Sequence, residues 1–329
     1  MTLRLVQDER RPQSVEPPVG RLPSSVEELP ERYQVLRDKG KRALEDGKLD
    51  VALSHFSSAI EVAESIGDQD KADLAFCNWV STALFLREEC SDTIKRLRGV
   101  LGRHGTPTTK DAAYLSCIAA YNLARVYELE NDAKKGLFYA RIALTRAQAS
   151  GDSFWIAAAH NQVANGLLAD SYFPKAVDAY KLALEEIPAG NDGIKAVILS
   201  NLGYALTVLG ELPEAFKVLY QSLRMYRSSG HVIYEPWPHL DLCNAYLEAG
   251  KLKSARTHGG KALRLAEDLG DLNLIKLSLF LMGTVERESG EYEAAFGHFT
   301  QLQSYYPDVA DLPATLMFID VRQVVNLRA

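Results

Sequence analysis

The chain has 329 residues, of which 47% are hydrophobic and 24% charged, a composition typical of folded proteins and unlike disordered or fibrous ones. The formal net charge of −6 disfavours nucleic-acid binding, which needs a clustered basic surface. No apolar run approaches the 18 residues of a membrane span, and the N-terminus lacks the apolar stretch of a secretory signal. We therefore expect a cytoplasmic protein that binds neither nucleic acid nor membranes.

The cysteines are few and scattered. Cys77, Cys90, Cys117 and Cys243 form no CxxC pair and no regular framework. This pattern favours buried thiols in a reducing compartment over disulfides.

Residues 1–30 differ in character from the rest of the chain. They carry five prolines and no sustained apolar periodicity, which predicts a flexible leader. From residue 31 the sequence is almost uninterrupted amphipathic helix, broken at regular intervals by glycine. We expect helical repeats over 31–310 and a capping helix over 311–329.

Two series of chain breaks recur along the helical part. In the first, Gly210, Gly250 and Gly290 are 40 residues apart, and Gly47, Asn131 and Ser171 extend the series backward. Glycine and asparagine tolerate the left-handed conformation that ends a helix, so these positions predict tight turns inside helical hairpins. In the second series, Gly-Asp pairs at 67–68, 151–152 and 270–271 end one hairpin and cap the next helix.

Small residues form a third series, with spacings of 39 to 43. Its members are Ala52, Thr93, Gly136, Ala176, Ala215, Ala255 and Ala295, and twelve residues before each lie Gly40, Ser81, Ala124, Ala164, Gly203, Cys243 and Gly283. Two helices approach closely only where neither carries bulk, so these pairs predict where the helices of each hairpin cross. Phe56, Tyr180 and Phe299, four residues after the small position, are expected to fill the space between hairpins.

The pattern resembles the tetratricopeptide repeat. The segments NLGY at 201–204 with GELPEA at 210–215, and Gly283 with GEYEAA at 290–295, match the hairpin signature of that family, whereas the second repeat departs most from it. The resemblance implies an all-α fold, a right-handed superhelical solenoid of seven such hairpins plus the capping helix.

A repeat near 40 residues with Gly-Asp junctions is similar to the longer-helix subclass, which includes kinesin light chains, spindle-polarity adaptors and bacterial pheromone receptors. That likeness implies a concave groove lined by the first helix of each hairpin. It favours a scaffold or adaptor that binds a peptide segment of another protein. A peptide-responsive sensor is an alternative. Receptors of that kind usually carry an N-terminal effector bundle, and residues 1–30 are too short and too rich in proline to form one, so we expect such a sensor to act through a separate effector. A structural subunit that self-associates through the solenoid ends is a third.

Polar and aromatic residues follow the predicted inner face of the first helices. Asparagine there can both donate to and accept from the backbone of an extended peptide, cations would favour an acidic or carboxylate ligand, and aromatic rings would anchor side chains. The predicted groove residues are Arg37, Lys41, Asn78, Tyr121, Arg125, Asn161, Asn165, Ser200, Tyr204, Trp237 and Asn244. Because a groove-lining amide is not core, we expect alanine at Asn161 and Asn165 to leave folding nearly unchanged.

Signatures of catalysis are absent from the sequence. There is no GxGxxG, no GxxxxGK[ST] phosphate loop, no HExxH and no GxSxG, and the seven histidines show no metal-ligand spacing. We therefore expect no enzyme activity, no cofactor and no metal. One further segment, 231–238, holds two prolines and three aromatic or histidine side chains, which serve either as a local plug or as part of a binding site.

Overall fold

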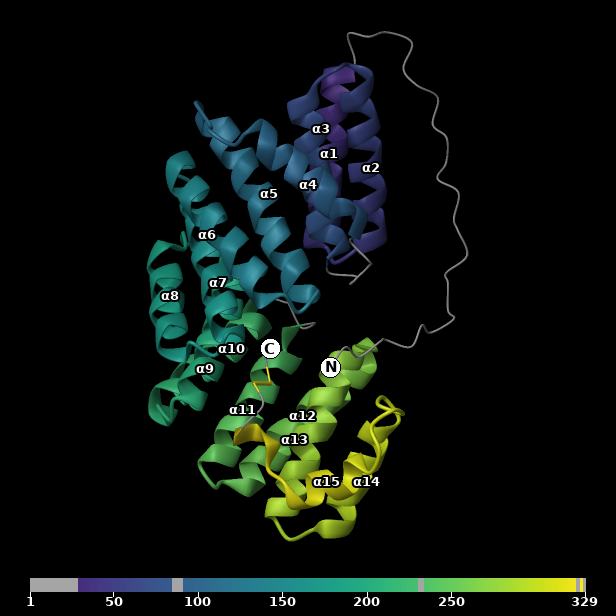
Figure 1. Ribbon diagram of the computed structural model, residues 1–329, viewed down its shortest axis with the longest axis vertical. Helices are drawn as coiled ribbons and strands as arrows, with labels where there is room; N and C mark the ends of the chain where they lie inside the picture. The colour runs from purple at the N-terminus through teal and green to yellow at the C-terminus, as the bar shows by residue number, and fades with distance from the viewer. Residues whose placement is uncertain (1–28, 85–90, 230–233, 324–325, 328–329) are drawn as a thin grey trace. The chain divides into compact units, whose positions relative to one another are not determined.

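The computed structural model describes residues 29–84, 91–229, 234–323 and 326–327 (Figure 1). The regular elements in these ranges are all helical, as predicted. The predicted leader, except for its last two residues, lies outside them, and so does the position near residue 89 where the repeat spacing predicts the turn of the second hairpin. No helix among the described residues has the length and apolar character needed to cross a membrane. The chain divides into two compact units, residues 1–88 and 89–329, which we describe separately.

Unit 1 consists of three helices, α1 (Leu29–Glu45), α2 (Leu49–Ser65) and α3 (Gln69–Ala83). Gly47 and Gly67 take left-handed backbone conformations between them, and the Asp68 side chain caps α3 by accepting from the Lys71 amide. The Phe56 ring lies against Gly40, where an added Cβ would come within 2.6 Å of it. This contact brings α1 and α2 together at the predicted crossing.

Unit 2 contains the remaining helices. They are α4 (Ser91–Arg103), α5 (Lys110–Leu129), α6 (Ala133–Ser150), α7 (Ser153–Ala169), α8 (Phe173–Glu186), α9 (Asp192–Val208), α10 (Leu212–Ser229), α11 (Pro236–Glu248), α12 (Leu252–Leu269), α13 (Leu272–Glu288), α14 (Tyr292–Gln303), α15 (Leu312–Phe318) and the 3-10 turn η3 (Val321–Gln323). From α5 to α14 they form consecutive antiparallel hairpins.

The turns within these hairpins fall where the glycine series predicts. Asn131, Ser171, Gly210, Gly250 and Gly290 all have positive φ. At Gly210, for example, the amide of Glu211 donates to the carbonyl of Leu206, which closes the end of α9. The backbone conformation of each turn is therefore encoded locally.

The second predicted hairpin departs from the regular pattern. Its helices would be α3 and α4, and these belong to different units. The division falls at the repeat whose sequence matches the family signature least well. The other predicted hairpins are each a packed pair of helices.

Close contacts within the hairpins use the predicted small residues. A Cβ at Gly203 would lie closer than 3.0 Å to Leu219, and one at Gly283 closer than 3.0 Å to Phe299. The expectation that Phe56 and Phe299 fill the space between hairpins is therefore wrong. Each ring lies over the glycine of its own hairpin, because the missing side chain leaves room there.

The first helices of unit 2 form a row. Helix α7 contacts α5 and α9, and α11 contacts α9 and α13. Each second helix packs between its own first helix and the next one, as α8 does between α7 and α9. The first helices therefore present one continuous set of residues along unit 2.

The C-terminal part is less helical than predicted. Helix α15 spans only Leu312–Phe318, and its cap Ile319 is extended. After α15 the described residues bond first to Glu248 at the end of α11 and then to Leu168 near the end of α7.

Candidate partner-binding surface

The predicted groove residues fall in both units. In unit 1, Arg37 and Lys41 on α1 and Asn78 on α3 are half-buried. Nε of Arg37 and Nδ2 of Asn78 are buried without a hydrogen-bond partner in the described structure. The structure gives these three residues no relation to the surface of unit 2, and their role in binding stays a prediction.

The aromatic and cationic residues of α5 pack toward α7. Tyr121 meets Trp155 edge to face, with ring centroids 5.5 Å apart. Burial raises the pKa of Tyr121, and the neighbouring charge of Arg125 opposes that rise. The same cation opposes the pKa rise that burial causes at Tyr234, just before α11.

Asparagines cluster where α7, α8 and α9 meet. Oδ1 of Asn165 accepts from the Tyr180 hydroxyl at 2.8 Å and from Nδ2 of Asn201 at 3.2 Å. The same Nδ2 lies 3.5 Å from Oδ1 of Asn161. The side-chain oxygens of Asn161 and Asn165, predicted to bond a peptide, thus already accept from the side chain of Asn201.

A second polar contact joins α9 to α11. The Ser200 hydroxyl donates to Oδ2 of Asp241 at 2.7 Å, and both side chains are buried. The Ser200 side chain is therefore bonded inside the fold, whereas the sequence predicted that it lines the groove.

Asn244 on α11 occupies the repeat position of Tyr204, one hairpin further along. Its side chain is 6% exposed, and its Oδ1 has no hydrogen-bond partner in the described structure. Trp237, at the start of the same helix, is half-buried against the apolar cluster that α11 shares with α12 and α13. A buried acceptor without a donor is costly, and Oδ1 of Asn244 would reach a ligand only after the side chain turns toward the surface.

Four of the predicted residues are more buried than an open groove allows. The exposed fractions are 5% for Asn161, 2% for Ser200, 4% for Tyr204 and 6% for Asn244. Helical periodicity identifies the face of a helix, but not what covers it. Here neighbouring first helices and the C-terminal chain cover it.

The C-terminal chain bonds directly to this surface. The hydroxyl of Tyr204 donates to Oδ1 of Asn326 at 3.0 Å and accepts from the amide of Leu327 at 3.0 Å. Nδ2 of Asn326 donates to the carbonyl of Leu168, near the end of α7, at 2.7 Å. Leu327 also packs against the apolar clusters on both sides of this point.

Several residues of this surface were not predicted from the sequence. Asn201 lies three residues before Tyr204 on the same face of α9, so its spacing could have revealed it. Asn326 and Leu327 lie beyond the repeats, where no periodic signal exists. Their contacts cross more than 120 residues of sequence.

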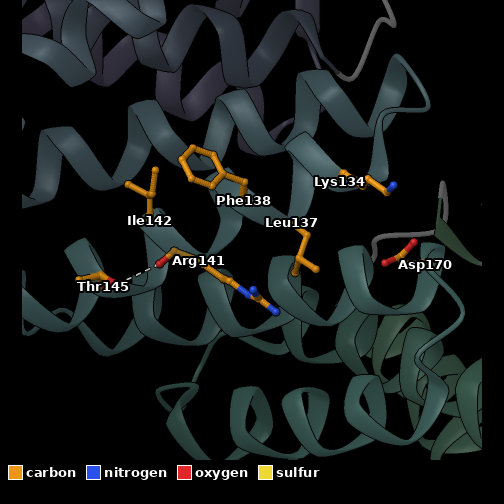
Figure 2. A pocket seen from close by; sticks show the side chains of 7 residues that line it. All are labelled: Lys134, Leu137, Phe138, Arg141, Ile142, Thr145 and Asp170. Carbon is orange, nitrogen blue, oxygen red and sulfur yellow. Dashed lines mark hydrogen bonds between the residues drawn. The ribbon is translucent and has the colours of Figure 1, made fainter.

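A shallow hollow of about 400 Å³ lies beside α6 (Figure 2). Its lining comes from α6 and the end of α7, and comprises Lys134, Leu137, Phe138, Arg141, Ile142, Thr145 and Asp170. Phe138 is 59% exposed there. The hollow shares no residue with the predicted groove and provides a control surface.

Thiols and histidines form no metal cluster in the described ranges, where no three His, Cys, Asp or Glu side chains gather suitably. Cys77, Cys117 and Cys243 are buried free thiols, and Cys90 lies outside the described residues.

The comparisons with known proteins concern the fold. No protein-family model matches the sequence, and no curated protein is similar to it. Among solved structures, apo RapI superposes with a TM-score of 0.62 at 13% identity, covering 84% of this chain and 99% of RapI. A Rap protein complexed with competence and sporulation factor gives 0.60 at 15% identity, covering 87% of this chain and 76% of its own.

BtubC (BKLC) from P. vanneervenii gives a TM-score of 0.54 at 17% identity, covering 65% of this chain and 90% of BtubC. The fold is of the tetratricopeptide type. The tetratricopeptide-type architecture agrees with the resemblance to kinesin light chains and pheromone receptors that the repeat spacing indicated.

Proposed function

We propose that the protein is an interaction module that holds a peptide segment of a partner protein along the first helices of unit 2. The observation that carries this proposal is that Tyr204 and the end of α7 already hold a non-helical stretch of chain. They bond both to its backbone, at Leu327, and to a side chain, that of Asn326. A surface that recognises one such segment has the chemistry to recognise another.

The chemistry of the site suits a peptide. The Tyr204 hydroxyl donates and accepts at once, so it satisfies a peptide amide and a side-chain carbonyl together. The Leu168 carbonyl, in the last turn of α7, accepts from the Ser171 amide and from Nδ2 of Asn326, because a carbonyl oxygen has two lone pairs. These groups are fixed in place by packing and lose little entropy when a ligand binds.

Asn244 extends the site by one hairpin. Its buried Oδ1 gains a hydrogen bond only from a group that the described chain does not supply. A backbone amide of a bound peptide is such a donor. A ligand longer than the Asn326–Leu327 pair therefore gains a further bond at α11.

The similar structures agree with this proposal. One of the Rap proteins that share the fold is complexed with competence and sporulation factor. Partner binding by this chain, without catalysis and without a cofactor, is the function that its surface supports best.

The division into two units favours a second candidate, a peptide-responsive regulator. In that scheme the three helices of unit 1 form the output and unit 2 the receptor. A ligand that binds one arrangement of the units better would shift the population toward it. Fluorescence energy transfer between dyes on unit 1 and unit 2 would change on ligand addition for a regulator and stay constant for a scaffold.

The experiment for the main proposal begins with a random-peptide library selected on the full chain. The peptide obtained is titrated against wild type, Asn244→Leu and Arg141→Ala. Asn244→Leu removes an acceptor that has no internal partner, so it leaves stability equal or raised. It should weaken the peptide by about five- to tenfold, the value of one hydrogen bond.

Arg141→Ala, in the hollow beside α6, is the matched control and should not change the affinity. The opposite order of the two variants would move the binding surface to the hollow. Equal affinity for all three proteins, or no selected peptide, would contradict the proposal.

A further inference from the structure

Residues 319–323 and 326–327, here called the C-terminal strap, bond to four first helices. Its described residues bond in turn to Arg287 on α13, Glu248 on α11, Tyr204 on α9 and Leu168 on α7. Each of these residues lies in the last turn of its helix. The strap therefore crosses the surface proposed to bind a partner.

The strap begins at a cation on α13. Nη1 of Arg287 donates to the carbonyl of Leu316 at 2.5 Å and to that of Ile319 at 3.0 Å, and Nη2 lies 3.9 Å from Oδ2 of Asp320. These bonds close the C-terminal end of α15 and turn the chain back toward α11.

A bidentate ion pair follows. Arg322 donates to Asp320 through Nε at 3.0 Å and through Nη2 at 2.6 Å, and its Nη1 donates to Glu248 at 2.9 Å. Burial raises the pKa of Asp320, but the hydrogen bonds and charge of Arg322, with the charge of Arg287, outweigh it and leave that pKa lowered. The Asp320 carboxylate therefore orients Arg322 and lies near Arg287 on α13, while Arg322 links the strap to Glu248 on α11.

The far end of the strap is an asparagine followed by a leucine. Asn326 uses both ends of its amide, one on Tyr204 and one on Leu168, while Leu327 adds a backbone bond and apolar packing. This combination defines a recognition element: a side-chain amide followed by an aliphatic residue.

We propose that the strap is an internal occupant of the partner site, and that the partner displaces it with a peptide that presents an asparagine followed by an aliphatic residue. The inference rests on the proposed function, because it assigns the ligand class and the regulation of the same surface. A tethered occupant acts at a high effective concentration, so free ligand binds with an affinity reduced by the fraction of open chains.

The contacts of the strap can be displaced by a competing ligand. Its ion pairs are half-exposed on the acidic side, with side-chain exposures of 29% for Asp320 and 34% for Glu248, so water and salt screen them. Among its described residues, Val321 and Leu327 pack against the apolar clusters. A ligand that reproduces the bonds of Asn326 and Leu327 therefore competes for the same partners.

The experiment uses the full chain and a fluorescein-labelled peptide of the sequence of residues 318–329. Its affinity is measured by anisotropy for wild type and for the double variant Asn326→Ala/Leu327→Ala, which leaves the site intact and frees it of its occupant. We expect the variant to bind at least about tenfold more tightly than wild type. A peptide with the same two substitutions should bind the variant at least tenfold more weakly.

Equal affinity of wild type and variant, an affinity insensitive to the two peptide substitutions, or no binding to either chain would overturn the proposal. If the variant does not fold, hydrogen exchange of the strap in wild type decides. Saturation with a library-selected peptide should speed exchange there, and unchanged exchange would overturn the inference. A library peptide that is sensitive to Asn244→Leu but leaves the strap protected would sink this inference alone, and the proposed function would stand.

Discussion

The hydroxyl of Ser200 on α9 donates a 2.7 Å hydrogen bond to Oδ2 of Asp241 on α11, with both side chains at most 2% exposed. The bond joins two successive first helices across 41 residues of sequence. Ser200→Ala should lower the free energy of unfolding by about 1–3 kcal/mol, because it removes the donor of a buried carboxyl group.

Urea denaturation checks this expectation. Thr300→Ala is the matched control, because that hydroxyl donates to the carbonyl of Phe296 on the exposed side of its own helix. It should change stability by no more than about 0.5 kcal/mol. A loss at Thr300 equal to that at Ser200 would show that the α9–α11 bond contributes nothing specific.

The contact between Gly203 and Leu219 gives a second prediction. A Cβ at residue 203 would lie closer than 3.0 Å to the Leu219 side chain, so Gly203→Ala should cost about 1–3 kcal/mol by overpacking α9 against α10. Gly260, inside α12, has no atom within 4 Å of an added Cβ. Gly260→Ala should therefore stabilise by about 0.5–1 kcal/mol through helix propensity.

The two glycine variants are measured side by side by thermal melting. Their opposite signs separate the effect of the close contact from the general effect of alanine in a helix. A stabilising Gly203→Ala would mean that Leu219 moves aside at no cost.

Two imidazoles give a prediction for pH. Nδ1 of His239 on α11 and Nδ1 of His258 on α12 are 2.8 Å apart, and Nη2 of Arg227 lies 3.4 Å from Nε2 of His239. Burial, together with the charges of His258, Lys261 and Arg227, lowers the pKa of His239 to about 3. Burial, together with the charges of Lys261 and Arg227, lowers the pKa of His258 to about 4.

Both histidines are therefore neutral in the folded state where unfolded histidine begins to bind protons, near pH 6.5. As the pH falls from about 6.5 toward 4, the unfolded chain takes up protons that the folded chain does not, and stability declines. Above pH 6.5 both histidines are neutral in the folded and in the unfolded chain, so this loss of stability is absent. The midpoint of urea denaturation, followed over this range, measures the decline.

His258→Gln should roughly halve this part of the pH dependence, because it removes one of the two titrating groups. A slope that survives His258→Gln intact would place the titrating groups elsewhere.

The sequence predicted the local features of this fold well and its long-range features less well. Asn131 and Ser171 have positive φ, as predicted from their places in the regularly spaced series of helix ends. The glycine contact at residue 203 follows from the same repeat. The hydrogen bond between Asn326 and Leu168 spans 158 residues and belongs to no repeat, so no periodic pattern predicts it.

The binding face shows the same division. Periodicity placed Asn161, Asn165, Ser200 and Tyr204 on the first helices. It did not predict that they are covered, because the covering groups come from a neighbouring helix or from the end of the chain. Their part in partner binding stays a prediction.

Asn165 provides the last prediction, and here the structure changes the expected outcome. Its Oδ1 accepts from the Tyr180 hydroxyl and from the amide of Asn201, so it links α7 to α8 and α9. Asn165→Ala should therefore lower the free energy of unfolding by about 1–3 kcal/mol, whereas the sequence alone suggested almost no effect.

Asn165→Asp tests whether the accepting oxygen holds the helices together. Aspartate keeps the oxygen that Tyr180 and Asn201 bond to, and it replaces the amide donor with a second, negatively charged acceptor, so much of the stability lost in Asn165→Ala should return. The exposed Gln148→Ala on α6 is the control and should stay within about 0.5 kcal/mol of wild type. If Asn165→Asp unfolds as readily as Asn165→Ala under urea, the oxygen does not hold the three helices together. The link between α7, α8 and α9 would then have to come from their apolar contacts alone.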